Sequence, residues 1–359
     1  MLPEVTSQTI LDVLISQARE ARTFRSSHVS RLPAPPTALE FSRLVRDNFP
    51  VVIEHVADSW PAMERWRSKM YLEQKVTKPV TVAVTPNGLA DAVVEGHFVL
   101  PHEQKLSFAD LLSHFPPKSA TTLSAEEEMD SSQWRSGDPA PPTYYCQSQN
   151  NNMHDEFTEL LEDIPPDITW ASDAFGKPPD AVNFWMGGRK SVTALHKDHY
   201  ENLYVVVAGT KTFILIPPQE QFCLYERLFP TATYHPTRTS FTEPPTWTIL
   251  PTSPQTSTPW IPVNPLHPSP TDHPLYTQHC RPLIVTVHAG ETLYLPSLWY
   301  HQVLQEEEGL DRFRAVVAVN YWYDMSFGGA WAAGRVVGRL GRVVTGVEEW
   351  EEGEDGEEE

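Results

Sequence analysis

The sequence predicts a mainly β fold of the barrel or sandwich kind, with flanking helices. Short runs of β-branched residues recur through the middle of the chain and are separated by turn residues, a pattern typical of these folds. Apolar residues at helical spacing appear near both ends, where they predict helices that flank the sheets. The chain of 359 residues has 34 prolines against 17 glycines, which predicts long loops between the core strands.

Residues 1–49 are predicted to form a helical region that packs on the core. The residue Thr6 can cap a first helix, in which apolar residues recur at helical spacing up to Ala18. A second helix is expected over residues 39–45, because apolar residues recur there before Pro50.

Residues 50–325 are predicted to form one catalytic domain with insertions near 116–142 and 231–282. The first insertion is rich in Pro, Ser, Thr and Glu and is expected to be flexible, and the second is rich in proline. Strands are expected at 51–56, 80–84, 182–186, 192–195, 203–207, 212–216, 283–287, 292–295, 301–304 and 313–323. Helices are expected after Ser107, a capping residue, and over 156–162.

Turns in this domain are predicted by glycine. The sequence Pro86-Asn87-Gly88 ends one strand with a strong turn signal. Gly209 separates two strands and predicts a hairpin.

The C-terminal region is predicted to contain a helix and an acidic tail. Residues 326–347 have helical character, although Gly334, Gly338 and Gly341 weaken it. Residues 348–359 include nine acidic residues and no basic one, so a disordered tail is expected. The net charge of −20 argues against binding to nucleic acid and favours basic polypeptide partners.

Three scattered cysteines predict a reducing compartment. Cys146, Cys223 and Cys280 form neither a disulfide framework nor a zinc motif. Near the N-terminus there is no long apolar run, so neither a signal peptide nor a membrane span is expected. The predicted location is the cytoplasm, with the nucleus as a second compartment.

The spacing His196-x-Asp198 predicts part of a metal site. On an extended strand, residues two apart point to the same side, so an imidazole and a carboxylate would lie together. Two histidines and one carboxylate form the facial triad of non-haem Fe(II) oxygenases. By sequence alone, the second histidine could be His279, His288 or His301.

Several long motifs resemble the Jumonji-C (JmjC) branch of the cupin-like oxygenases, and within it the family of JmjC domain-containing protein 7. They are residues 84–92 (VTPNGLADA), 170–172 (WAS), 180–187 (DAVNFWMG), 195–203 (LHKDHYENL), 290–296 (GETLYLP) and 320–325 (NYWYDM). The resemblance extends over about residues 50–325, outside the two insertions. It implies a double-stranded β-helix, or jelly-roll, and assigns the third ligand to His301.

The resemblance also implies a cofactor set of Fe(II), 2-oxoglutarate and O2. Lys211 would pair with the far carboxylate of 2-oxoglutarate, supported by hydroxyls of Thr193 and Tyr145. Asn202 and Asn320 would bind the cosubstrate or orient oxygen. Because Thr193 and His196 have opposite parity along a strand, both can line one pocket only if the strand contains a bend or bulge.

A protein hydroxylase is the function that the resemblance implies. Its target would be a lysine carbon in developmentally regulated GTP-binding proteins of the TRAF class, and no membrane or direct nucleic-acid partner is expected. One alternative is demethylation of N-methyl-lysine or N-methyl-arginine, against which the shortage of cysteines for a zinc module argues modestly. The other is a non-catalytic cupin-like binding module.

Overall fold

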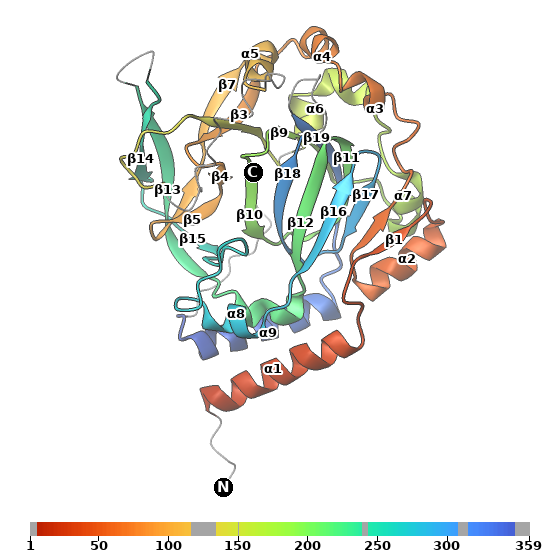
Figure 1. The fold of residues 1–359 in the computed structure, drawn as a ribbon. Helices are drawn as coiled ribbons and strands as arrows, with labels where there is room; N and C mark the ends of the chain where they lie inside the picture. The colour runs from red at the N-terminus through yellow and green to blue at the C-terminus, as the bar shows by residue number, and fades with distance from the viewer. Residues whose placement is uncertain (1–5, 116–133, 150, 239–242, 308–314, 349–359) are drawn as a thin grey trace.

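The computed structural model describes residues 6–115, 134–149, 151–238, 243–307 and 315–348, and Figure 1 shows their arrangement. The acidic tail beyond residue 348 and most of the first insertion lie outside the described residues. The division of the chain into the regions predicted above stays a prediction.

Two facing sheets form the centre of the molecule. The larger sheet has the order β1 (Ser30–Leu32), β2 (Val51–Ile53), β17 (Thr292–Leu295), β11 (Tyr200–Ala208), β19 (Val316–Asp324), β9 (Ala181–Gly187), β8 (Thr143–Cys146), β3 (Val80–Thr85) and β7 (His102–Leu106). The second has the order β16 (Leu283–His288), β12 (Thr210–Ile216), β18 (Tyr300–Glu306), β10 (Val192–His196) and β4 (Leu89–Ala90). A shared apolar cluster joins them, with Tyr204 and Val206 from β11 against Phe213 and Leu215 from β12.

The chain alternates between these sheets as it passes from β9 to β12 and again from β16 to β19. This alternation is the strand arrangement of a jelly-roll core and confirms the predicted fold class. The prediction of a hairpin at Gly209 is wrong, because β11 pairs with β17 and β19 whereas β12 pairs with β16 and β18. Gly209 does form a turn, at φ +74°, but the turn carries the chain from one sheet to the other.

A third sheet covers one side of the core and contains much of the second insertion. Its order is β14 (Thr246–Pro251), β13 (Arg227–Thr237), β6 (His97–Leu100) and β5 (Ala92–Val94), and β15 (Ser257–Trp260) also pairs with β13. The proline-rich composition therefore does not prevent strand formation in this segment. Pro230 and Pro236 lie outside the stretch Thr231–Thr233 that pairs with β6, so their missing N–H groups leave that pairing intact.

Helices flank the sheets, as expected. They are α1 (Ser7–Thr23), α2 (Ala38–Asp47), α3 (Ala62–Arg65), α4 (Lys69–Lys75), α5 (Phe108–Ser113), α6 (Asn152–Asp155), η3 (Thr158–Asp163), α7 (Thr169–Phe175), η4 (Pro218–Cys223), α8 (Pro274–His279) and α9 (Gly329–Thr345). Thr6 and Ser107 cap α1 and α5 by accepting hydrogen bonds from Thr9 N and Asp110 N. In the described part of the chain, no helix is long and apolar enough to cross a membrane.

The helix predicted over 156–162 corresponds to the 3₁₀ helix η3, which begins two residues later, at Thr158, after the end of α6. Glu156 lies between them, and its carboxylate accepts hydrogen bonds from Thr81 N and from the side chains of Thr81 and Lys105. These tertiary contacts hold Glu156 at the junction of the two helices.

The glycines of α9 allow that helix to pack closely on η4. A Cβ atom on Gly338 would lie 2.6 Å from Gln221 Nε2, and one on Gly341 would lie 2.8 Å from Phe222 Cα. Gly341 is therefore required by its contact with the backbone of η4, and Gly338 allows close approach of the Gln221 side chain, whereas a Cβ atom on Gly334 would meet only Leu298 Cδ1 at 4.0 Å.

Candidate metal centre

His196 and His301 are brought together by strand pairing. They are cross-strand partners on β10 and β18, and their ring centroids are 4.2 Å apart. Asp198 Oδ1 lies 3.7 Å from His196 Nε2, and its Oδ2 lies 3.5 Å from His301 Nε2. Potential ligand atoms of the three residues all lie within 4.8 Å of one another, which is close enough for one ion.

The spacing predicted that His196 and Asp198 lie on one extended strand, and this prediction is wrong. Strand β10 ends at His196, and Asp198 occupies the connection to β11. Its carbonyl accepts a hydrogen bond from Leu298 N at 3.0 Å, which ties this connection to the loop that precedes β18. The carboxylate therefore reaches the histidines from a turn.

Both imidazoles are oriented for metal binding. His196 Nδ1 lies 2.8 Å from the Ala194 carbonyl oxygen, and His301 Nδ1 lies 3.0 Å from that of Trp299. Since a carbonyl only accepts, each Nδ1 must carry the proton, and each Nε2 has its lone pair directed toward Asp198. Burial is the main reason that the pKa of His301 is lowered to about 4, so its imidazole is neutral near pH 7. The donor set fits a divalent metal such as Fe(II).

A β-bulge explains how Thr193 and His196, which have opposite parity along the strand, can line the same cavity. The pairing of β10 with β18 changes register between Thr193↔Val303 and His196↔His301, with an extra residue on β10. This irregularity turns Thr193 to the same side as His196. Both residues line a small cavity of about 20 Å³ between the two sheets.

Lys211 projects into the barrel as a buried cation. The side chain has no exposed surface, and its Nζ donates to the Tyr145 hydroxyl at 3.1 Å. That hydroxyl lies 3.4 Å from Thr193 Oγ1. Burial lowers the pKa of Lys211 to about 7. Within the described residues no carboxylate forms an ion pair with this ammonium, so an anionic ligand would provide the missing partner.

Asn202 and Asn320 line the same cavity from β11 and β19. Asn320 Oδ1 accepts from Trp185 Nε1 at 2.9 Å, and Asn320 Nδ2 donates to Asn202 Oδ1 at 3.3 Å. The two amides thus form an ordered polar row on one wall. Two aromatic residues, Trp185 and Trp322, also line the cavity.

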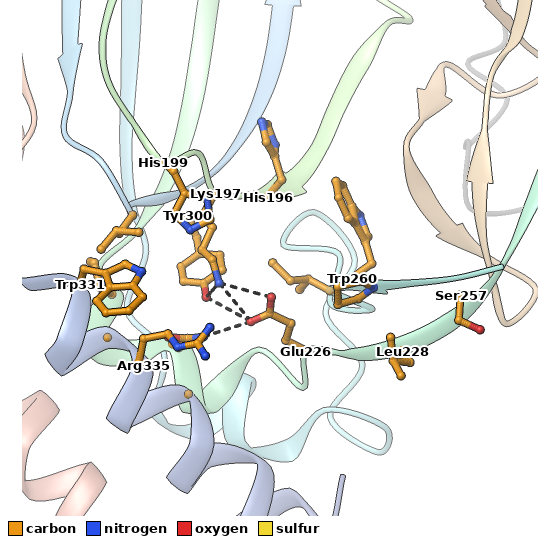
Figure 2. A pocket seen from close by; sticks show the side chains of 17 residues that line it. His196, Lys197, His199, Glu226, Leu228, Ser257, Trp260, Tyr300, Trp331 and Arg335 are labelled. Atoms are coloured by element: carbon orange, nitrogen blue, oxygen red, sulfur yellow. Dashed lines mark hydrogen bonds and ion pairs between the residues drawn. The ribbon is translucent and has the colours of Figure 1, made fainter. Parts of the chain in front are cut away.

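A larger cleft opens beside the metal ligands, and its residues were not predicted from sequence. Figure 2 shows His196 and Trp260 at one side, with Trp331 and Arg335 of α9 across from them. Lys197 Nζ lies 3.3 Å from Glu226 Oε1 and 3.2 Å from the Tyr300 hydroxyl. Although burial acts to raise it, the pKa of Glu226 is lowered by the Lys197 ammonium and by hydrogen bonding. The only sequence signal was the position of Lys197 between two predicted ligands.

Comparison with known proteins matches residues 36–329 to the cupin-like domain. A human relative named bifunctional peptidase and (3S)-lysyl hydroxylase JMJD7 is 38% identical over 300 residues, which cover 83% of this chain and 85% of the relative. The chain belongs to the cupin-like JmjC family. JmjC domain-containing protein E of Dictyostelium discoideum is 36% identical over 335 residues, covering 88% and 90% of the two chains. Lysine-specific demethylase JMJ32 of Arabidopsis thaliana is 35% identical over 322 residues, covering 86% of each chain.

JmjC enzymes are, as a family, Fe(II)- and 2-oxoglutarate-dependent oxygenases. The histidine and carboxylate cluster of this chain could bind the metal, and it combines residues from β10, the β10–β11 connection and β18. The individual roles given to Lys211, Thr193, Tyr145, Asn202 and Asn320 stay predictions. The relatives carry the names of both hydroxylases and demethylases, so family membership establishes the oxygenase class and leaves the product to be determined.

Proposed function

We propose that this protein is an Fe(II)- and 2-oxoglutarate-dependent hydroxylase of a lysine side chain in a protein substrate. The observation that carries the proposal is the fully buried ammonium of Lys211, which forms no ion pair with any described carboxylate and lies in the barrel that also contains His196, Asp198 and His301. A buried cation without a protein counterion calls for an anionic ligand, and the far carboxylate of 2-oxoglutarate supplies one. Bound together with O2, iron and 2-oxoglutarate would supply the oxidising power to hydroxylate an unactivated C–H bond.

The protein residues would perform binding and positioning. His196, Asp198 and His301 would hold the metal on one face, which leaves the opposite positions for ligands. Lys211 would hold the far end of 2-oxoglutarate, with Tyr145 orienting the ammonium. The apolar and aromatic walls of the barrel would exclude water from the reacting centre.

We propose that the substrate is a developmentally regulated GTP-binding protein of the TRAF class. Two observations support a basic protein substrate: the formal net charge of −20 favours cationic partners, and the human relative is named a (3S)-lysyl hydroxylase. Incubation of the two proteins with Fe(II), 2-oxoglutarate and O2 should add the mass of one oxygen to a lysine-containing peptide.

A double variant, His196→Ala with Asp198→Ala, is the control and should give no mass gain. Succinate formed without oxygen gain on the substrate would retain the oxygenase chemistry and reject this target. No succinate with any substrate tested would reject the enzyme proposal itself.

Demethylation is the second candidate, because the Arabidopsis relative is named a lysine-specific demethylase. Hydroxylation of an N-methyl group would release formaldehyde and remove the mass of one methyl unit. A methylated lysine peptide assayed beside the GTP-binding protein distinguishes the two reactions. Formaldehyde release, with no oxygen retained on either substrate, would favour the demethylase.

A further inference from the structure

A second groove, distinct from the cleft of Figure 2, adjoins the metal cavity and contains two carboxylates. Asp91, Glu103, Gln147 and Gln149 line it, with Thr81 and Thr233 on the strands beside them. Gln149 also lines the metal cavity, so the groove and the cavity adjoin. No lysine or arginine lines the groove within the described residues, whereas the cleft of Figure 2 is lined by Lys197 and Arg335.

Asp91 is held beside the metal ligands by strand pairing. It directly follows β4, whose Ala90 pairs with Thr193 of β10, and Figure 1 shows β4 beside β10. The backbone of Asp91 adopts φ +51°, an unusual conformation for a residue with a side chain. The resulting turn between β4 and β5 puts the carboxylate in the groove, where it interacts electrostatically with His196.

The Asp91 carboxylate is incompletely paired. Its Oδ2 accepts a hydrogen bond from Gln147 Nε2 at 2.8 Å, and among the described residues its Oδ1 has no hydrogen-bond donor. Neither Asp91 nor Glu103 forms an ion pair with a described lysine or arginine. Burial raises the pKa of Asp91 to about 6, despite the opposing effects of His196 and Gln147. A cation bound in the groove would stabilise the charged form of Asp91, which burial disfavours.

We propose that Asp91, assisted by Glu103 at the rim of the groove, binds the ammonium group of the target lysine and thereby selects that side chain. This inference rests on the proposed function and names the residues that recognise its substrate. A lysine whose ammonium is held by Asp91 would have its methylene groups directed along Gln149 toward the metal cavity. Glu226 is not equivalent, because Lys197, Tyr300 and Gln221 already pair with its carboxylate.

The test compares the affinities of two small probes that differ in charge. Nα-acetyl-lysine N-methylamide and Nα-acetyl-norleucine N-methylamide would be titrated against protein loaded with Fe(II) and 2-oxoglutarate under nitrogen, with binding followed by ligand-observed NMR. Wild-type protein should bind the lysine probe about tenfold more tightly, because a charged hydrogen bond in a partly buried site is lost with norleucine.

The Asp91→Asn variant should bind both probes equally while its affinity for 2-oxoglutarate is unchanged. Asparagine is suited to this position because it tolerates positive φ. Glu103→Gln, at an exposed position, should reduce the preference by about threefold. The matched control is Glu95→Gln, which removes the same charge from the neighbouring β5–β6 turn outside the groove and should keep the full preference.

Equal binding of both probes by wild-type protein would overturn the inference, whichever variants fold. A preference that survives in Asp91→Asn would also overturn it. These measurements need no turnover, so they are independent of the oxygen-transfer assay that tests the proposed function. A wild-type preference abolished in Asp91→Asn, together with no oxygen gain on any lysine, would retain the cation site and reject the hydroxylase.

Discussion

Two lysines near the metal ligands differ in their partners: Lys197 has a carboxylate partner, and Lys211 has none among the described residues. Lys197, in the cleft, is paired with Glu226 and Tyr300. Lys211, in the barrel, donates to the Tyr145 hydroxyl, forms no ion pair with a described carboxylate and has no exposed surface. A paired charge can be explained by structure alone, whereas an unpaired buried charge costs stability and is retained where a ligand uses it. This contrast is the reason for proposing that the barrel side binds the anion.

The metal ligands adjoin both the cleft and the barrel cavity. Replacing one of them should have the largest effect on metal affinity and turnover. Replacing His301 by alanine should lower metal affinity by at least about 100-fold and reduce turnover below detection, because the remaining two ligands cannot hold the ion on one face. Titration with Fe(II) under nitrogen measures the affinity. His279→Ala, in α8, is the matched control; an equal loss in that variant would contradict the assignment of His301.

Replacing Lys211 should change 2-oxoglutarate affinity and protein stability in opposite directions. In Lys211→Met, we expect 2-oxoglutarate affinity to fall by about 100-fold, since a buried ion pair is lost. We also expect the free energy of unfolding at pH 7 to rise by roughly 2 kcal/mol, since a buried ammonium is removed. Calorimetry measures the first quantity and denaturant unfolding the second. Reduced stability with unchanged 2-oxoglutarate affinity would mean that Lys211 is a structural residue.

Replacing Glu226, the partner of Lys197, should lower the stability of the protein and leave its 2-oxoglutarate affinity nearly unchanged. Glu226→Gln leaves the Lys197 ammonium without its counterion, so the free energy of unfolding should fall by about 2 kcal/mol. The affinity for 2-oxoglutarate should stay within about twofold of wild type, because Glu226 lies outside the barrel cavity. The double variant Lys197→Met with Glu226→Gln should recover part of the stability. A large loss of 2-oxoglutarate affinity in Glu226→Gln would contradict the conclusion that the cleft and the barrel bind independently.

The pH dependence of stability and of 2-oxoglutarate affinity should be a smaller effect, and the titration of Lys211 should cause it. The unfolded lysine keeps its proton up to its ordinary pKa of 10.5, whereas the folded one loses it above about 7. Between these pH values the unfolded state binds more protons, so the stability of the protein without 2-oxoglutarate should rise with pH. Affinity for 2-oxoglutarate should fall over the same range, by at most about tenfold per pH unit, because the neutral amine must first take up a proton. Lys211→Met should lack the stability dependence; if it keeps the wild-type slope, another group is responsible.

Much of the architecture was predictable because strands and caps depend on local patterns. The strands around Val182, Leu203 and Thr292 were found from short β-branched runs, and the caps at Thr6 and Ser107 from residue type. Errors arose where tertiary contacts override local preference. Gly209 marks a turn in either a hairpin or a sheet-to-sheet crossing, and only the partners of the flanking strands distinguish the two.

The candidate site was partly predictable for a related reason. His196 and Asp198 are neighbours in sequence, so their spacing was a usable signal. The irregularity seen in β10 was expected only if Thr193 and His196 line one pocket, as the family resemblance implies. The Lys197 and Glu226 pair and the Asp91 groove were missed. Their members come from separate segments, and a carboxylate at a turn has no sequence pattern that distinguishes it from an ordinary surface residue.

The amino-acid sequence determined the succession of strands and the residue types available to a metal, since these follow from periodicity and side-chain chemistry. Tertiary structure decided that His301, and neither His279 nor His288, meets His196 and Asp198. It also decided that one lysine is unpaired in the barrel while another has a carboxylate partner. Burial and pairing depend on which distant strands become neighbours, and that information is not contained in any local segment of the chain.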